Sequence, residues 1–151
     1  MKQKRAIEIL ARALIRDKRG RVLACRNKKG DYYYLPGGHV EHGETARAAA
    51  ARELMEECAQ PSRVCDLCLV LENQYSRKGR VIHEYSLVFR ASFRRAVLHV
   101  KSCESYIEFS WLDDKQLRQA DFRPAQAKNW LLSPASHDAS TCDFRTESSV
   151  D

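Results

Sequence analysis

Residues 6–28 contain two apolar stretches. AIEILARALI and RVLAC are separated by DKRG at residues 17–20, whose polar residues and glycine suit a turn between two strands. The apolar positions of the first stretch also fit a helical spacing, so its periodicity leaves a helix open as an alternative. Further on, DYYY at residues 31–34 predicts a short aromatic strand, and PGGHVEHG at residues 36–43 predicts a loop whose glycines let the backbone approach a ligand.

The clearest helical pattern runs from Thr45 to about Ala59. TARAAAARELMEECA is dense in strong helix formers, Thr45 offers a capping hydroxyl, and Pro61 stops the helix. We therefore predict a helix of three to four turns directly after the glycine-rich loop.

The second half of the chain predicts strands first and short helices afterwards. Residues 63–75 and 80–93 are typical of a hairpin, and IEFSWL at residues 107–112 is typical of another strand. DDKQLRQA at residues 113–120 and PAQAKNWLLS at residues 124–133 predict two short helices. This order indicates an α/β or α+β sandwich in which helices cover a mixed sheet.

The length of 151 residues suits one domain with a single core. We expect this domain to span residues 1–133. Residues 134–151 are polar and lack periodicity, which predicts a flexible C-terminal tail.

Basic residues outnumber acidic ones by 26 to 20, and the excess lies near the N-terminus. Such a surface favours polyanions, whether nucleotide phosphates or RNA, although a solvated basic surface explains the same residues. No uncharged run is long enough for a membrane span, and Glu8, Arg12 and Arg16 interrupt the first apolar stretch, unlike a signal peptide. We expect a cytoplasmic protein that does not act at a membrane.

Cysteine usage agrees with a reducing compartment, because a chain of this length needs no disulfides to hold a core. Cys65 and Cys68 have the spacing of a metal or redox pair, but they lie in the apolar run VCDLCLVL and no second pair completes a site. We expect them to pack in the core. The six cysteines are Cys25, Cys58, Cys65, Cys68, Cys103 and Cys142.

Three carboxylates share one face of the predicted helix. At about 100° per residue, Glu53 and Glu57 lie nearly in line and Glu56 lies less than a third of a turn away. Like charges this close repel, so the arrangement favours a bound cation, and oxygen ligands suit Mg²⁺ or Mn²⁺. Gly37 and Gly38 could add a backbone carbonyl to the metal or backbone amides to a phosphate.

The segment from residue 38 to residue 60 resembles the signature of the Nudix, or MutT-type, hydrolase family. YLPGGHVEHGE before the helix, HEYSLVF after it, and the spacing of Glu104, Glu108 and Trp111 are also similar to that family. Ala59 and Gln60 depart from the expected glycine and apolar residue, which predicts a different helix exit. The positions that match the signature are Gly38, Glu44, Arg52, Glu53, Leu54, Glu56 and Glu57.

The resemblance implies an α/β/α sandwich around a mixed sheet and a magnesium-dependent pyrophosphohydrolase. It implies that Glu53 and Glu57 bind the metal, with Glu56 sharing the metal or acting on water, and that Glu44 pairs with Arg52. A carboxylate would take a proton from water as it attacks phosphorus. Glu56 and Glu104 are the candidates for this base, and Glu104 ranks ahead of Glu108, which suits an ordinary surface position of a strand.

The substrate stays open in the sequence. The resemblance implies a nucleoside diphosphate linked to another group, such as a nucleotide sugar, ADP-ribose or a nucleoside triphosphate. An RNA 5′ end and a noncatalytic nucleotide sensor are the alternatives, and a homodimer stays open. Arg26 could bind phosphate, although a solvated surface position explains it equally well. Tyr34 could stack on a base, although aromatic residues in strands more often belong to the core.

Overall fold

A computed structural model describes residues 6–150 and contains one mixed sheet and one small antiparallel sheet. The large sheet has the strand order β4-β1-β6-β5-β8, and the small sheet has the order β3-β2-β7. Within the large sheet β1 runs parallel to β6 and β5 runs parallel to β8, while the other neighbours are antiparallel. The strands are β1 (Ile7–Ile15), β2 (Val22–Asn27), β3 (Tyr32–Tyr34), β4 (Gly37–His39), β5 (Ser62–Arg77), β6 (Arg80–Phe93), β7 (Ile107–Leu112) and β8 (Asp143–Ser148).

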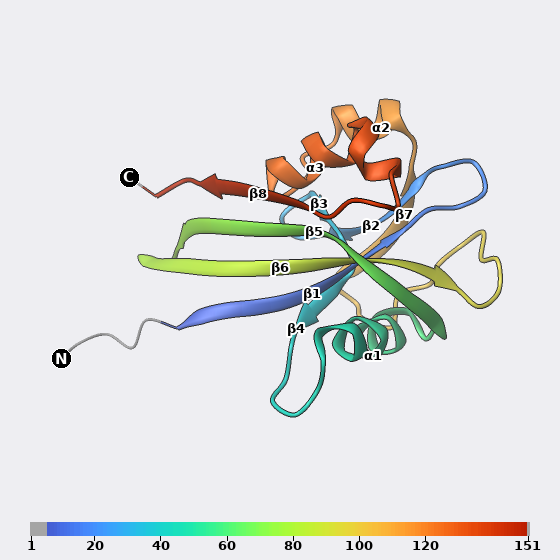
Figure 1. Cartoon of the computed structure of the whole chain (residues 1–151), viewed down its shortest axis with the longest axis horizontal. Coiled ribbons are helices and arrows are strands. Elements are labelled where there is room, and N and C mark those ends of the chain that lie inside the picture. Colours follow the sequence, from blue (N-terminus) through green and yellow to red (C-terminus); the bar gives the residue numbers. More distant parts are fainter. Residues whose placement is uncertain (1–5, 151) are drawn as a thin grey trace.

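Helices cover the large sheet from both sides (Figure 1). The helix α1 lies on one side, while α2 and α3 lie on the other. The small sheet packs against both groups, because Leu23 of β2 belongs to the cluster of α1 whereas Val22 and Ala24 belong to the cluster under α2 and α3. The predicted sandwich of helices around a mixed sheet is therefore confirmed. The helices are α1 (Ala46–Cys58), α2 (Asp114–Gln119), α3 (Ala125–Leu131) and the 3₁₀ helix η1 (Pro134–His137).

The first apolar stretch is a strand, β1, and not the helix that its spacing also allowed. Its residues alternate between the two faces of the sheet, as the period of two in a strand requires. Ala11 and Ala13 belong to the clusters on the side of α1, whereas Leu14 belongs to the core cluster under α2 and α3. Because β1 lies inside the sheet, both of its faces are buried, and this hides the alternation in the sequence.

The helix α1 begins at its predicted cap, where the Thr45 hydroxyl accepts a hydrogen bond from the Ala48 N–H at 3.2 Å. Ala50 and Leu54 are fully buried on its inner face. The predicted change at the helix exit is wrong. Ala59 takes the left-handed conformation, with φ 53°, that a glycine ordinarily takes at this position.

The predicted hairpin is present as β5 and β6, with Lys78 and Gly79 at its turn. Register shifts interrupt the pairing between Val64 and Leu69, so β5 bulges where the two neighbouring cysteines lie. Cys68 is buried, and its thiol donates to the Val88 carbonyl at 3.3 Å, which confirms core packing for this residue. Cys65 is half-buried.

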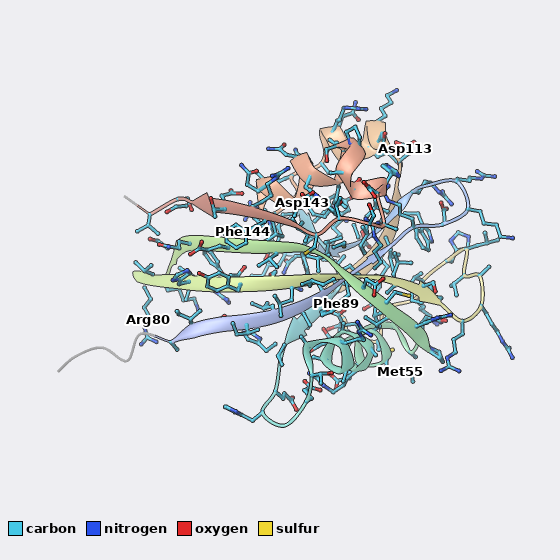
Figure 2. The ribbon with its side chains drawn as sticks, viewed as in Figure 1. Met55, Arg80, Phe89, Asp113, Asp143 and Phe144 are labelled. Carbon is cyan, nitrogen blue, oxygen red and sulfur yellow. The ribbon has the colours of Figure 1, made fainter. Side chains whose placement is uncertain are left out.

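The segment after Ser133 differs from the expected flexible tail. It forms η1 and then β8, which extends the large sheet by pairing parallel to β5. Figure 2 shows Asp143 at the start of β8, beside α3, where its carboxylate accepts a hydrogen bond of 2.6 Å from the Trp130 indole. Because β8 is a largely exposed edge strand held by backbone pairing, it needs no hydrophobic alternation that the sequence could reveal.

None of the helices within residues 6–150 combines the length and the apolar character that a membrane span requires.

Candidate active site

A cleft of about 1030 Å³ opens between the large sheet and the small sheet. Its walls come from strands β1, β3, β4, β5, β6 and β8, from helices α1 and α3, and from the segments before β7 and before α3. Three residues of β1, Glu8, Leu10 and Arg12, line it in a row, because alternate positions of a strand share a face. Glu53 and Glu57 of α1 line one end of the cleft.

Two glycines at β4 bring this end of the cleft together. Gly37 has φ 134°, and a side chain there would overlap the backbone of β1 at Ala11. Its N–H donates to Glu57 Oε2 at 3.1 Å, while its carbonyl accepts from Arg12 Nη1 at 2.8 Å. A side chain at Gly38 would overlap the carboxylate of Glu53. Close approach of the β1 backbone therefore explains Gly37, and close approach of the Glu53 carboxylate explains Gly38.

Glu57 is a buried carboxylate, with only 5% of its surface exposed. Burial, together with the negative charges of Glu53 and Glu104, raises the pKa of Glu57 to about 7. The charge of Arg12 and the hydrogen bond from Gly37 oppose this rise in pKa. A divalent cation fits such a group, because it would offset both the lost hydration and the repulsion between carboxylates.

Arg52 holds the outer part of the helix to the glycine-rich segment. Its guanidinium binds both carboxylate oxygens of Glu44, at 2.6 and 3.1 Å, and donates to the His39 carbonyl at 3.0 Å. It also contacts Glu53 at 3.1 Å. The Glu44–Arg52 contact that the resemblance implied is therefore present, and Arg52 fixes the position of one cleft carboxylate.

Glu56 does not join the other two carboxylates. More than half of its side-chain surface is exposed, it does not line the cleft, and its contact is with Arg52 at 3.2 Å. Within residues 6–150 no three His, Cys, Asp or Glu side chains lie close enough together to hold a metal ion. The structure thus brings Glu53 and Glu57 to the cleft but leaves Glu56 at the solvent edge of α1.

Glu104 reaches the cleft from the segment before β7. The Cys103 N–H donates to the Glu57 carbonyl at 2.7 Å, which ties this segment to the end of α1. Ser102 fixes the backbone of Glu104, with hydrogen bonds of 2.8 and 3.0 Å. A hydrogen bond from Tyr106 to the Glu104 carboxylate raises the pKa of Tyr106 to about 12. Glu104 is therefore positioned from two sides.

The sequence analysis selected Arg26 for phosphate, but the structure does not bring it to this cleft. Arg26 binds Glu108 and Asp31, both at 2.6 Å, along the small sheet. The carboxylate of Glu108 is therefore engaged in this ion pair with Arg26. Its pairing across the strands explains its place in β7 without a role in the cleft.

Arg12 lines the cleft, as do Arg77 and Arg123, and the sequence did not identify it as a site residue. Besides Gly37, it binds the Leu35 carbonyl at 3.2 Å, and its guanidinium lies 5.5 Å from the centre of the Tyr34 ring. Tyr34 lines the cleft as well, and burial raises its pKa. A charged residue between Leu10 and Leu14, on the same face of a buried strand, was the feature that could have identified Arg12.

Comparison with known proteins agrees with this arrangement. A family model described as NUDIX domain matches residues 8–131, so this chain belongs to the Nudix family and is a Nudix hydrolase.

Solved structures share the fold at low sequence identity. A MutT protein from Methanosarcina mazei Go1 superposes with a TM-score of 0.67 at 23% identity, covering 85% of this chain and 93% of its own. A NUDIX hydrolase from Nitrosomonas europaea gives 0.71 at 17% identity, with 91% and 93% covered. An ADP-ribose pyrophosphatase from Streptococcus suis 89-1591 gives 0.66 at 11% identity, with 93% and 98% covered. At these identities the likeness establishes the fold alone.

Proposed function

We propose that this protein hydrolyses a phosphoanhydride bond in a nucleoside diphosphate that is linked to another group, with Mg²⁺ as the cofactor and Mn²⁺ as a substitute. The observation that carries the proposal is the buried carboxylate of Glu57, which Gly37 holds in the cleft beside Glu53 and Glu104. Such a carboxylate destabilises the fold unless a cation or a substrate group offsets its charge.

Glu53 and Glu57 would hold the metal, and the Gly37 carbonyl, which keeps a lone pair beside its bond to Arg12, is a third oxygen donor. When bound, the metal neutralises charge on the diphosphate and lowers the pKa of water. Glu44 and Arg52 act as positioning residues, because their contacts fix Glu53 and the backbone at His39.

Glu104 is the general base of this proposal. It lies in the cleft on a segment fixed to α1, and it takes the proton of the attacking water while the anhydride oxygen leaves with the second phosphate. Glu56 fits this role less well because it does not line the cleft. Arg12 lies on the same wall, where its charge suits a phosphate oxygen.

The size of the cleft and the structurally similar proteins support the proposed substrate class. The structurally similar proteins include an ADP-ribose pyrophosphatase and a UDP-X diphosphatase, and both names describe a nucleoside diphosphate joined to a second group. The cleft volume of about 1030 Å³ is large enough for such a ligand.

The test is hydrolysis in the presence of Mg²⁺ across ADP-ribose, nucleotide sugars, nucleoside triphosphates, dinucleoside polyphosphates and RNA with a 5′ triphosphate. We expect turnover of at least one nucleoside diphosphate derivative, and a loss of more than about 100-fold in Glu57→Gln, because loss of outer-sphere partners alone costs 10- to 100-fold. Phosphorus NMR identifies the anhydride bond that breaks.

Glu72→Gln is the matched control. Glu72 pairs with His83 at 2.8 Å and with Tyr85 at 2.9 Å, and it does not line the cleft, so turnover should be unchanged. Nucleotide binding without turnover of any of these compounds would contradict the proposal and favour a nucleotide sensor. Turnover of the RNA end alone would replace the small-molecule substrate with RNA.

A further inference from the structure

The cleft has a second polar end, on β5 and β6, that the proposed chemistry does not use. Glu84 lines it with only 9% of its surface exposed. Its oxygens lie 3.5 Å from the Asn73 amide nitrogen and 3.4 Å from the Tyr75 hydroxyl, beyond the usual range for hydrogen bonds. No salt bridge of Glu84 is found among residues 6–150. A buried carboxylate with two weak partners has acceptor capacity left for a ligand.

Strand register places this end at a defined distance from the catalytic end. Glu84 pairs with Glu8 of β1, whereas Arg12 of β1 pairs with Gly37 beside Glu57. Four residues of extended strand separate Glu8 from Arg12, which is about 13 Å. A ribose and a diphosphate can bridge this separation, so a nucleotide whose phosphates reach Glu57 would bring its base to Glu84.

Glu84 and Asn73 lie opposite each other in the β5–β6 pairing and form a compact hydrogen-bonding set. The Asn73 amide supplies an N–H donor next to the two acceptor oxygens of Glu84. Guanine presents the complementary set, a carbonyl followed by a ring N–H and an amino group. Adenine and cytosine place an amino donor where the Asn73 donor lies, and uracil has a single N–H.

We propose that Glu84 and Asn73 bind the edge of the nucleobase and select a base that carries adjacent N–H donors beside a carbonyl, as guanine does. The inference rests on the proposed function in one respect, since it takes the base to belong to the nucleotide whose diphosphate is cleaved. Glu84 is a specificity-determining residue in this reading, and it takes no part in bond cleavage.

The experiment measures binding of nucleoside monophosphates, which lack an anhydride bond, by nitrogen–proton correlation NMR. Wild-type protein should bind GMP about 10-fold more tightly than AMP, with IMP between them, because a bidentate pair discriminates by a factor of this order. Glu84→Gln should remove this preference while the affinity for AMP is retained. Asn73→Asp, which replaces the donor by an acceptor, should weaken GMP more than AMP.

Glu72→Gln is again the control, because Glu72 is on the adjacent position of β5 but binds His83 and Tyr85 instead of lining the cleft. It should keep the preference for GMP, and the dispersion of the NMR spectrum reports whether each variant is folded. Equal binding of GMP and AMP by the wild type would overturn the proposal. So would an equal loss of both in Glu84→Gln, which indicates a structural role.

Binding of deoxyguanosine monophosphate distinguishes a contact of Glu84 with the base from a contact of Glu84 with the ribose hydroxyls. If its binding no longer depends on Glu84, the carboxylate binds the ribose hydroxyls, and the assignment to the base is overturned. The two proposals also fail separately. A preference for GMP in a protein that hydrolyses no anhydride would support the base site and contradict the proposed function.

Discussion

Two neighbouring glutamates at the end of α1 differ in their exposure to solvent. Glu57 is buried against β4 and receives one backbone hydrogen bond, whereas the Glu56 side chain is 56% exposed and contacts Arg52. An exposed pair of this kind contributes little free energy, because water and salt screen it. The buried carboxylate of Glu57 lowers the free energy of unfolding when it is ionised, and a bound cation would offset this loss. The difference in burial, more than the spacing along the helix, therefore distinguishes the metal-binding role proposed for Glu57 from the exposed ion pair of Glu56.

After the loss expected in Glu57→Gln, the largest effect is expected at Arg52, which contacts both the exposed Glu56 and the cleft carboxylate Glu53. Arg52→Lys should lower kcat about 10- to 100-fold, because a lysine cannot fork between Glu44, Glu53 and the His39 carbonyl. Steady-state kinetics on the best substrate of the hydrolysis assay measures the change.

Glu56→Gln is the comparison for Arg52→Lys. It removes a single exposed contact of Arg52 and should cost no more than about fivefold in kcat. If it loses as much activity as Arg52→Lys, then Glu56 acts in the reaction itself, and the contrast between the two glutamates does not hold.

A second prediction concerns pH and stability without metal. Because the pKa of Glu57 is about 7 in the folded protein against 4.5 for an ordinary glutamate, folding disfavours the ionised form. The contribution of Glu57 to the free energy of unfolding therefore falls as pH rises from 4.5 to about 7, and it stays low above that. Glu57→Gln should be more stable than the wild type at pH 8, by on the order of 2 kcal/mol.

Urea denaturation in EDTA at a series of pH values measures this difference. Other titrating groups are shared by the two proteins, so the difference between them isolates Glu57. It should shrink toward zero as pH falls below 4.5, where the wild-type carboxyl is protonated in both states. A difference that does not change with pH would show that Glu57 is not desolvated.

The smallest effect is expected at the end of α1. Ala59 has φ 53°, which costs an alanine more than a glycine, so Ala59→Gly should raise the free energy of unfolding by about 1 kcal/mol. The value of kcat should not change, since Ala59 does not line the cleft. Ala51→Gly, in the middle of the same helix, should lower the free energy of unfolding by about 1 kcal/mol. Stabilisation by both glycines would contradict the role of backbone conformation at Ala59.

Local patterns predicted much of the fold. The Thr45 cap, the hairpin of β5 and β6, and β7 depend on residues close together in the chain, and the structure has each of them. The edge strand β8 was missed because its partners are backbone groups of β5, some 70 residues away, and its exposed side chains follow no alternation. The glycine-rich segment was expected to be a loop, yet Gly37–His39 pairs with β1 as β4.

The sequence by itself determined the family and the helix that carries Glu53 and Glu57. These follow from residue identity at fixed spacing, which acts over one or two helical turns. Only the tertiary structure decided which charged groups enter the cleft. Arg12 enters it because β1 lies beside β4, while Arg26 is held by Glu108 on another sheet. Burial and charge pairing depend on chain segments that are distant in sequence, and these two effects set the chemistry of each carboxylate.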